Sequence, residues 1–126
     1  MSLSDSNRAI VQRFVELFYY KREVRQAFET CVAEDYVQHN PNILDGREAA
    51  IAFLEPMFSR AGSRFDVKRI LVDGDLAAVH LHGQPSGNEP GGAVVDLFRL
   101  QDGLIVEHWD VLQPMPERSI NPHPMF

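Results

Sequence analysis

The sequence predicts an α+β domain in which three N-terminal helices pack on one face of a curved antiparallel sheet. Apolar residues recur at helical spacing between residues 10 and 58, whereas from Arg64 onward they alternate with polar residues, as in strands. Helices followed by antiparallel strands are typical of the α+β class. Strands of this length would bend around the helices and leave a pocket between the two layers.

Three segments carry the helical pattern. The first follows Ser4 and Ser6, and its apolar face comprises Ile10, Val11, Phe14, Val15, Leu17 and Phe18. The second, shorter helix is expected to end near Ala33 and has apolar residues at Val24, Ala27, Phe28 and Cys31. Residues 36–41 break the pattern, because the residue before Pro41 is pushed out of helical geometry. The third helix opens at Gly46, and Pro56 should kink or shorten it.

Two Asp-Gly pairs between apolar runs predict two β-hairpins and therefore four strands. Asp73-Gly74 lies between the first two strands and Asp102-Gly103 between residues 93–101 and 104–112. Residues 84–92 are rich in Pro and Gly and are expected to form a mobile loop. Residues 114–126 contain four prolines, so we expect a domain of residues 1–113 followed by a tail that covers a surface or a neighbouring subunit, or is disordered.

Composition excludes several classes of function. A chain of 126 residues with 44% hydrophobic residues is long enough for one core and too short for two ordinary domains. The net charge of -6 argues against nucleic acid as a partner, because clustered Lys and Arg provide that affinity. The single cysteine, Cys31, rules out an intrachain disulfide and a cysteine-rich metal site. No signal-like start and no membrane-spanning apolar run is found, so we expect a cytoplasmic protein without a membrane partner.

The second hairpin carries the candidate site, because Asp96, His108 and Asp110 interrupt its apolar strands. A charged carboxylate in an apolar layer costs several kcal/mol unless it is paired or protonated. Side chains alternate across a strand, so His108 and Asp110 are expected to share one face with Leu104, Val106 and Leu112.

The turn decides whether Asp96 joins them. A two-residue loop at Asp102-Gly103 would place Asp96 opposite Trp109 on the wrong face. A three-residue loop with Gly103 in the left-handed conformation would place Asp96 directly opposite His108. We expect the three-residue loop, because it gathers the polar groups on one side.

An Asp beside a His in an apolar cavity can act as a proton shuttle, since desolvation and the imidazole act on the carboxyl group in opposite directions. The alternative is a cross-strand pair that only fastens the hairpin, contributing about 0.5 kcal/mol. His80 and His82 share a face of the preceding strand, and His82, nearer the loop, is the preferred pocket residue. Phe14, Phe18, Tyr19 and Tyr20 are most simply core residues, with the alternative that one of them lines the cavity. The histidines and carboxylates show no compact ligand motif, so neither a metal nor a cofactor is expected.

Four motifs together resemble the SnoaL-like polyketide cyclases: residues 36–41, 46–48, 96–99 and 103–111. These enzymes belong to the group that shares the cone-shaped fold of nuclear transport factor 2 and ketosteroid isomerase. The resemblance extends to about Gln113. It implies a cone-shaped curved sheet around three helices, a deep apolar pocket and commonly a homodimer built on the sheet.

The resemblance also implies residue roles. In the cyclases an Asp on a late strand is the acid/base of an intramolecular aldol closure, assisted by a pocket His, without metal or cofactor. Asp96 matches that Asp by its place before Phe98-Arg99, and His82 on the preceding strand is the candidate for the helper. Motif positions are also matched by His39, His108 and Asp110. The Tyr and protonated Asp of the ketosteroid isomerases cannot be placed as a full set, which argues against a steroid substrate.

The sequence thus favours an enzyme of the cyclase/isomerase type, in which Asp96 moves a proton next to a carbonyl of a small hydrophobic molecule while His82 or His108 stabilises the enolate oxygen. The alternative is a non-catalytic module that binds a hydrophobic ligand or dimerises. A cavity that exposes Asp96 and a His would favour the enzyme. Apolar residues expected on the outer face of the sheet, Ile105, Trp109 and Val111, would form a dimer contact.

Overall fold

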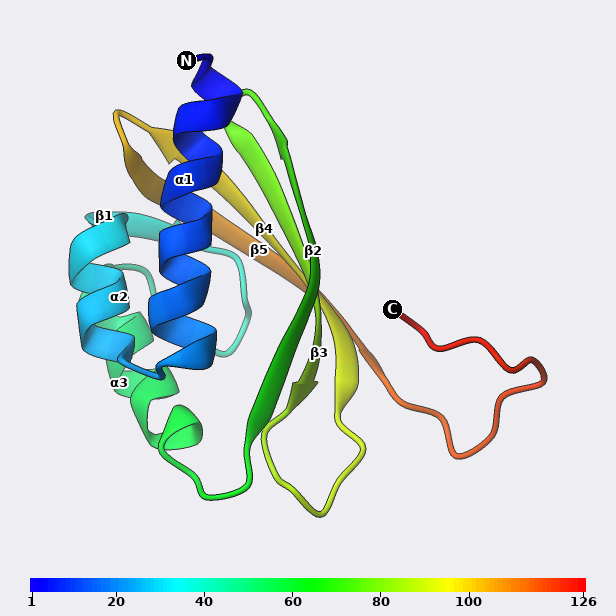
Figure 1. Cartoon of the computed structure of the whole chain (residues 1–126). Coiled ribbons are helices and arrows are strands. Elements are labelled where there is room, and N and C mark those ends of the chain that lie inside the picture. The colour runs from blue at the N-terminus through cyan, green and yellow to red at the C-terminus, as the bar shows by residue number, and fades with distance from the viewer.

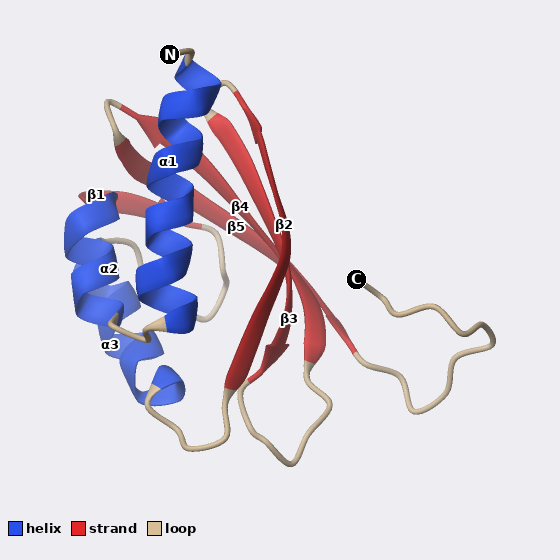
Figure 2. Cartoon of the chain, viewed as in Figure 1, coloured by secondary structure: helices blue, strands red, loops and turns tan.

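The chain forms two layers, with the helices packed on the concave face of one curved sheet (Figure 1). The computed structural model describes all 126 residues. The elements in chain order are helix α1 (Leu3–Val15), a π-helical turn (Glu16–Tyr20), α2 (Val24–Cys31), strand β1 (Val32–Gln38), α3 (Arg47–Phe58), β2 (Arg64–Asp73), β3 (Leu76–Gln84), β4 (Gly92–Gln101) and β5 (Leu104–Pro114). The predicted α+β class with three helices is confirmed, as Figure 2 shows by type of element.

The helices begin and end close to the predicted positions. Ser2 caps α1 through a reciprocal pair of hydrogen bonds with Asp5, which satisfies free backbone donors of the first turn. Gly46 precedes α3 with φ of 95°, a conformation that glycine adopts without strain. Pro56 does not stop this helix at once, since α3 ends two residues later at Phe58.

The sheet has five strands in the order β1-β5-β4-β3-β2, one more than predicted. The additional strand is β1, which pairs with β5 in parallel at one edge. Sequence patterning missed it because only Val32 and Tyr36 of its seven residues are buried. The predicted second helix accordingly ends at Cys31, before Ala33.

Both hairpins have two-residue turns. The first turn is Gly74-Asp75, one residue later than the expected Asp73-Gly74, and the three-residue loop expected for the second hairpin is wrong. Gln101 pairs with Leu104, and Asp102 and Gly103 have φ of 52° and 80°, as a type I′ turn requires. Asp96 nevertheless does not face Trp109. Its partner is Asp110, because a β-bulge follows the turn.

The bulge lies at Val106. Leu100 pairs with Ile105 whereas Arg99 pairs with Glu107, which leaves Val106 as the extra residue of β5. It shifts the alternation of β5 by one position. Ile105 is therefore fully buried in the core and not on the outer face, and the expectation that Leu104 and Val106 share the face of His108 is wrong.

The core lies between the two layers and is rich in aromatic side chains. Stacked or edge-on ring contacts join residues from both layers, namely Phe14, Phe18, Phe28, Phe58, Phe65 and Phe98. These rings hold the helices against the concave face. No helix of the chain has both the length and the apolar character needed to cross a membrane.

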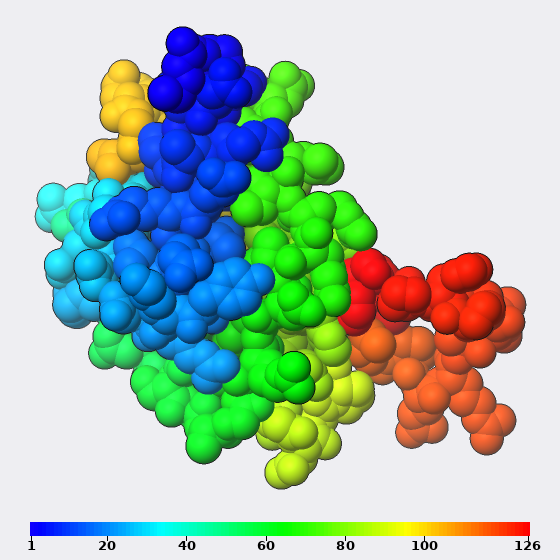
Figure 3. Space-filling model, in the orientation of Figure 1, coloured from blue at the N-terminus to red at the C-terminus, as the bar shows by residue number.

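Residues 115–126 form neither helix nor strand, and they stand away from the body of the protein (Figure 3). The chain returns at its end, where the ring of Phe126 stacks on His82 with 4.5 Å between ring centres. Lys68 lies over the same ring at 5.3 Å. The end of the tail is thus fastened to β2 and β3.

Candidate functional site

A cavity of about 350 Å³ lies between the helices and the concave face of the sheet. Of its 27 lining residues, 16 are hydrophobic. Its volume and apolar lining are typical of a small-molecule site with a few polar groups. The pocket expected from the sequence is therefore present, and the polar groups decide what it can do.

Three ionisable side chains of the second hairpin face this cavity, as expected. Asp96 comes from β4, and His108 and Asp110 come from β5. His108 Nε2 lies 2.9 Å from Asp96 Oδ1 and 3.9 Å from Asp110 Oδ2. The two carboxylates are cross-strand partners, and like charges so placed repel each other unless a cation or proton lies between them. His108 can supply that proton.

Tyr19 completes the surroundings of Asp96 from the helical layer. Its hydroxyl donates a hydrogen bond to Asp96 Oδ2. The π-helical turn that carries it buries three successive side chains, Leu17, Phe18 and Tyr19. Burial, and then the charge of Asp96, raise the pKa of Tyr19 well above its usual value of 10. The phenol therefore remains a hydrogen-bond donor at neutral pH.

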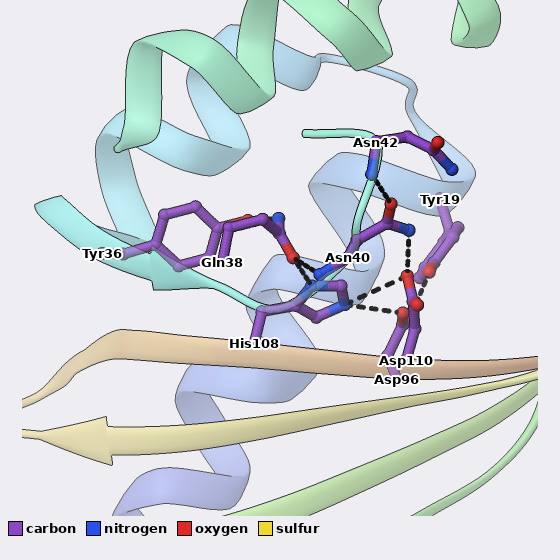
Figure 4. A network of polar contacts seen from close by, with 8 residues as sticks. All are labelled: Tyr19, Tyr36, Gln38, Asn40, Asn42, Asp96, His108 and Asp110. Atoms are coloured by element: carbon purple, nitrogen blue, oxygen red, sulfur yellow. Dashed lines mark hydrogen bonds and ion pairs between the residues drawn. The ribbon is translucent and has the colours of Figure 1, made fainter. Parts of the chain in front are cut away.

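The side-chain amides of Gln38, at the end of β1, and of Asn40, in the loop after it, contact His108 and Asp110 (Figure 4). Gln38 Oε1 lies 2.7 Å from His108 Nδ1 and also accepts a hydrogen bond from the backbone N–H of Asn40. Asn40 Nδ2 donates to Asp110 Oδ2 over 2.7 Å. Tyr36, whose pKa burial raises, accepts a hydrogen bond from Gln38 Nε2 over 2.6 Å.

The two carboxylates differ in how fully they are bonded. Asp96 is bonded at both oxygens, by Tyr19 and by His108, and its side chain is 8% exposed. Asp110 is bonded by Asn40 at Oδ2 only, and its side chain is 23% exposed. Asp110 therefore offers the oxygen that is free to meet a molecule in the cavity.

Two residues predicted for the site lie outside the cavity. His82 is on the convex face, where its Nε2 donates to the carbonyl of Pro90 over 2.7 Å. His39 stacks on Trp109 with 4.8 Å between ring centres, and its Nε2 lies 2.7 Å from Glu107 Oε2. The expected role of His82 as helper to Asp96 does not fit this placement, which leaves His108 as the histidine of the site.

Sequence reasoning missed Tyr19, Gln38 and Asn40. The expectation that Tyr19 is a core residue is confirmed, since it is 6% exposed, but a helical pattern of aromatic side chains does not reveal its hydrogen bond to Asp96. Gln38 and Asn40 lie two residues apart in the run Tyr36–Pro41, on one face of a strand, but β1 was not predicted. The spacing of this run was the signal that could have revealed them.

One potential metal-ligating atom each from Asp96, His108 and Asp110 lies within 4.8 Å of the others, a separation that a metal ion could bridge. However, Tyr19 and Asn40 direct hydrogen-bond donors at these carboxylates. A cation would have to displace the bond between Asp96 and His108. These three side chains and their hydrogen-bond partners thus fit a hydrogen-bonded cluster better than a metal centre.

The chain belongs to the SnoaL-like domain family, whose pattern matches residues 11–108. The structure is similar to an NTF2-like protein of unknown function from Mesorhizobium loti, with 25% identity, a TM-score of 0.74 and coverage of 90% of this chain and 95% of the other. A "putative ketosteroid isomerase" from Kribbella flavida matches at 22% identity and a TM-score of 0.76, covering 96% and 87% of the two chains.

A "Putative SnoaL-like polyketide cyclase" from Jannaschia sp. CCS1 matches at 22% identity and a TM-score of 0.65, covering 89% of this chain and 88% of its own. These similarities support the cone-like α+β fold. No protein with a curated description matches the sequence significantly.

Proposed function

We propose that this protein is an enzyme that transfers protons next to a carbonyl of a small, largely apolar molecule, as in an aldol-type closure or an isomerisation. The observation that carries the proposal is the cluster Asp96–His108–Asp110, which faces an apolar cavity of about 350 Å³. Burial of ionisable groups in a cleft is typical of acid/base sites. Membership of the SnoaL-like family supports this class of chemistry.

The hydrogen bonds suggest a division of roles. Asp110 has a free oxygen and accepts the proton from the carbon next to the carbonyl. The proton held between Asp96 Oδ1 and His108 Nε2 passes to the carbonyl oxygen. In the substrate one C–H bond breaks and one O–H bond forms, which gives an enol. Asp110 gains one proton and the Asp96–His108 pair loses one, so the net charge of the cluster is unchanged. The enol then reacts at carbon, or takes a proton back at another carbon, using the same groups.

The substrate is expected to be neutral. Two carboxylates share one histidine at the polar end of the cavity, and the other walls are mostly apolar. A carboxylate or phosphate on the ligand would be placed near like charge in a site of low polarity. A neutral ketone or polyketide-like molecule avoids this cost.

Exchange of α-protons tests the proposal without knowledge of the full reaction. The protein is incubated in deuterated buffer with a panel of neutral alicyclic and aromatic ketones, while NMR follows loss of each α-proton signal and saturation transfer reports binding. We expect faster exchange than in buffer for at least one ketone that binds. Ketones that bind in the cavity without faster exchange would contradict catalysis and favour the non-catalytic binding module.

We also propose that the protein forms a homodimer through the convex face of the sheet. This face carries exposed apolar side chains, among them Leu71, Leu97 and Val111, beside the half-buried Trp109. In a dimer with a two-fold axis, this patch on one copy would pack against the same patch on the other and be removed from water. Sedimentation of the wild type as a dimer and of Val111→Lys as a folded monomer is expected, whereas a monomeric wild type at micromolar concentration would contradict it.

A further inference from the structure

The orientation of the Gln38 side-chain amide is fixed by a backbone group that cannot rotate. Its Oε1 lies 2.9 Å from the backbone nitrogen of Asn40, and its Nε2 lies 2.6 Å from the hydroxyl oxygen of Tyr36. A backbone N–H can only donate, so the atom of Gln38 that faces it has to be the oxygen. The reverse orientation would bring two donors together.

This orientation determines where His108 carries a proton. The same Oε1 atom lies 2.7 Å from His108 Nδ1. An amide oxygen only accepts hydrogen bonds, so Nδ1 has to bear the hydrogen. The tautomer of a histidine is commonly set in this way by the partner of one of its two nitrogens.

His108 Nε2 is then left for the exchange of a proton with Asp96. Their separation is 2.9 Å, and two lone pairs at that distance would repel each other. One proton therefore lies between them, either on the imidazole or on the carboxyl group. Tyr19 donates to the other oxygen of Asp96 and cannot replace this proton at Oδ1.

Asn40 shows the same arrangement one step along the loop. Its Oδ1 accepts a hydrogen bond from the backbone N–H of Asn42 over 2.9 Å. Its Nδ2 therefore faces Asp110 as a donor. Backbone donors of one short loop thus set the orientation of both amides that contact the cluster (Figure 4).

We propose that Gln38 is a positioning residue that keeps the Nδ1–H form of His108, so that the proton available for transfer resides between His108 Nε2 and Asp96. The proposal rests on the proposed function for its catalytic meaning. Its structural content, the tautomer of His108, can be tested separately. Gln38 also lines the cavity, and it acts on the transferred proton through its hydrogen bond with His108.

The test measures the ¹⁵N chemical shifts of the imidazole nitrogens, with His108 assigned by comparison with His108→Gln. In the wild type, the shift of Nδ1 is expected to show a bound hydrogen over the whole pH range in which the protein is folded. In Gln38→Met the acceptor is lost, and a substantial share of His108 moves to the Nε2–H form. Gln38→Glu keeps an acceptor for both donors and should restore the wild-type signature.

Gln12→Met provides the matched control, because Gln12 is exposed on α1. A wild type with Nε2–H and bare Nδ1 would overturn the proposal, as would an unchanged tautomer in folded Gln38→Met. With an active ketone, exchange by Gln38→Met is expected to fall at least about tenfold with little change in KM. Absence of exchange in the wild type would contradict the proposed function, whereas the chemical shifts would still decide the tautomer.

Discussion

The two faces of the β4–β5 pair carry similar ionisable residues in different settings. On the concave face, Asp96 and His108 are 6% and 9% exposed and are held by hydrogen bonds beneath the helices. On the convex face, Glu107 accepts hydrogen bonds from Arg99 and from His39, whose side chain is 41% exposed. Alternation along the strand determines which face of the sheet a side chain lies on. Whether helices cover that face determines how a titratable group on it interacts.

Water makes the difference in energy. Glu107 is itself only 18% exposed, but its partners His39 and Arg99 are 41% and 34% exposed. An ion pair whose partner reaches water gains little, because solvent competes with it and screens its charges. In the apolar cavity the same types of group interact more strongly, and each needs its partners. The concave cluster should therefore control activity, while the convex contacts should affect stability slightly and leave activity unchanged.

Exchanging the histidines tests this contrast with the largest expected effect. His108→Gln removes the proton shared with Asp96 and should lower turnover of an active ketone by about 10²- to 10⁴-fold, the usual contribution of acid/base catalysis. His82→Gln is the matched variant on the convex face and should leave turnover unchanged. Equal losses of turnover in the two variants would contradict the claim that only the concave face controls activity.

The tyrosines of the π-helical turn allow a comparison of stability. Tyr19→Phe removes a buried donor from Asp96 and should lower the free energy of unfolding by about 1–3 kcal/mol. Tyr20→Phe removes the hydroxyl oxygen that accepts a hydrogen bond from the backbone N–H of Val67 at the surface, and it should cost less. Urea denaturation measures both. A larger loss for Tyr20→Phe would show that Asp96 does not depend on the phenol.

The smallest effect is expected at Glu107 and depends on pH. Hydrogen bonds from His39 and Arg99 lower the pKa of Glu107 below its usual value of 4.5. Its charged form therefore stabilises the fold above pH 4.5, and this contribution is lost as the pH falls through the lowered pKa. Glu107→Gln should slightly reduce the melting temperature at pH 7 and flatten its fall in acid, with turnover unchanged. If the melting temperature of Glu107→Gln fell in acid as steeply as that of the wild type, the acid loss of stability would not come from Glu107.

The sequence predicted the helices and hairpins well because their signals are local. Helical spacing and the Asp-Gly turns depend on neighbouring residues, and the strands they predict lie where expected. The strand β1 was missed, because pairing in parallel with β5 at the sheet edge leaves little apolar pattern. Long-range pairing of this kind cannot be recognised from periodicity.

The candidate site was predicted in part, and for an incomplete reason. Asp96, His108 and Asp110 do share one face, but a two-residue turn and the bulge at Val106 bring this about in place of a longer loop. No pattern in the sequence predicts the bulge. The expectation that His82 lines the pocket is wrong, because strand alternation shows which residues share a face and not which face the helices cover.

Asp96→Asn offers the most direct test of the central claim, that the concave cluster transfers protons on a bound molecule. The measurement is the rate of α-proton exchange for a ketone that saturates the cavity, compared between the wild type and this variant. The substitution keeps the size of the side chain but removes a site for the shared proton. We predict that exchange falls to the rate in buffer while the ketone still binds and the protein stays folded. Exchange at the wild-type rate from the ketone bound to Asp96→Asn would contradict the account.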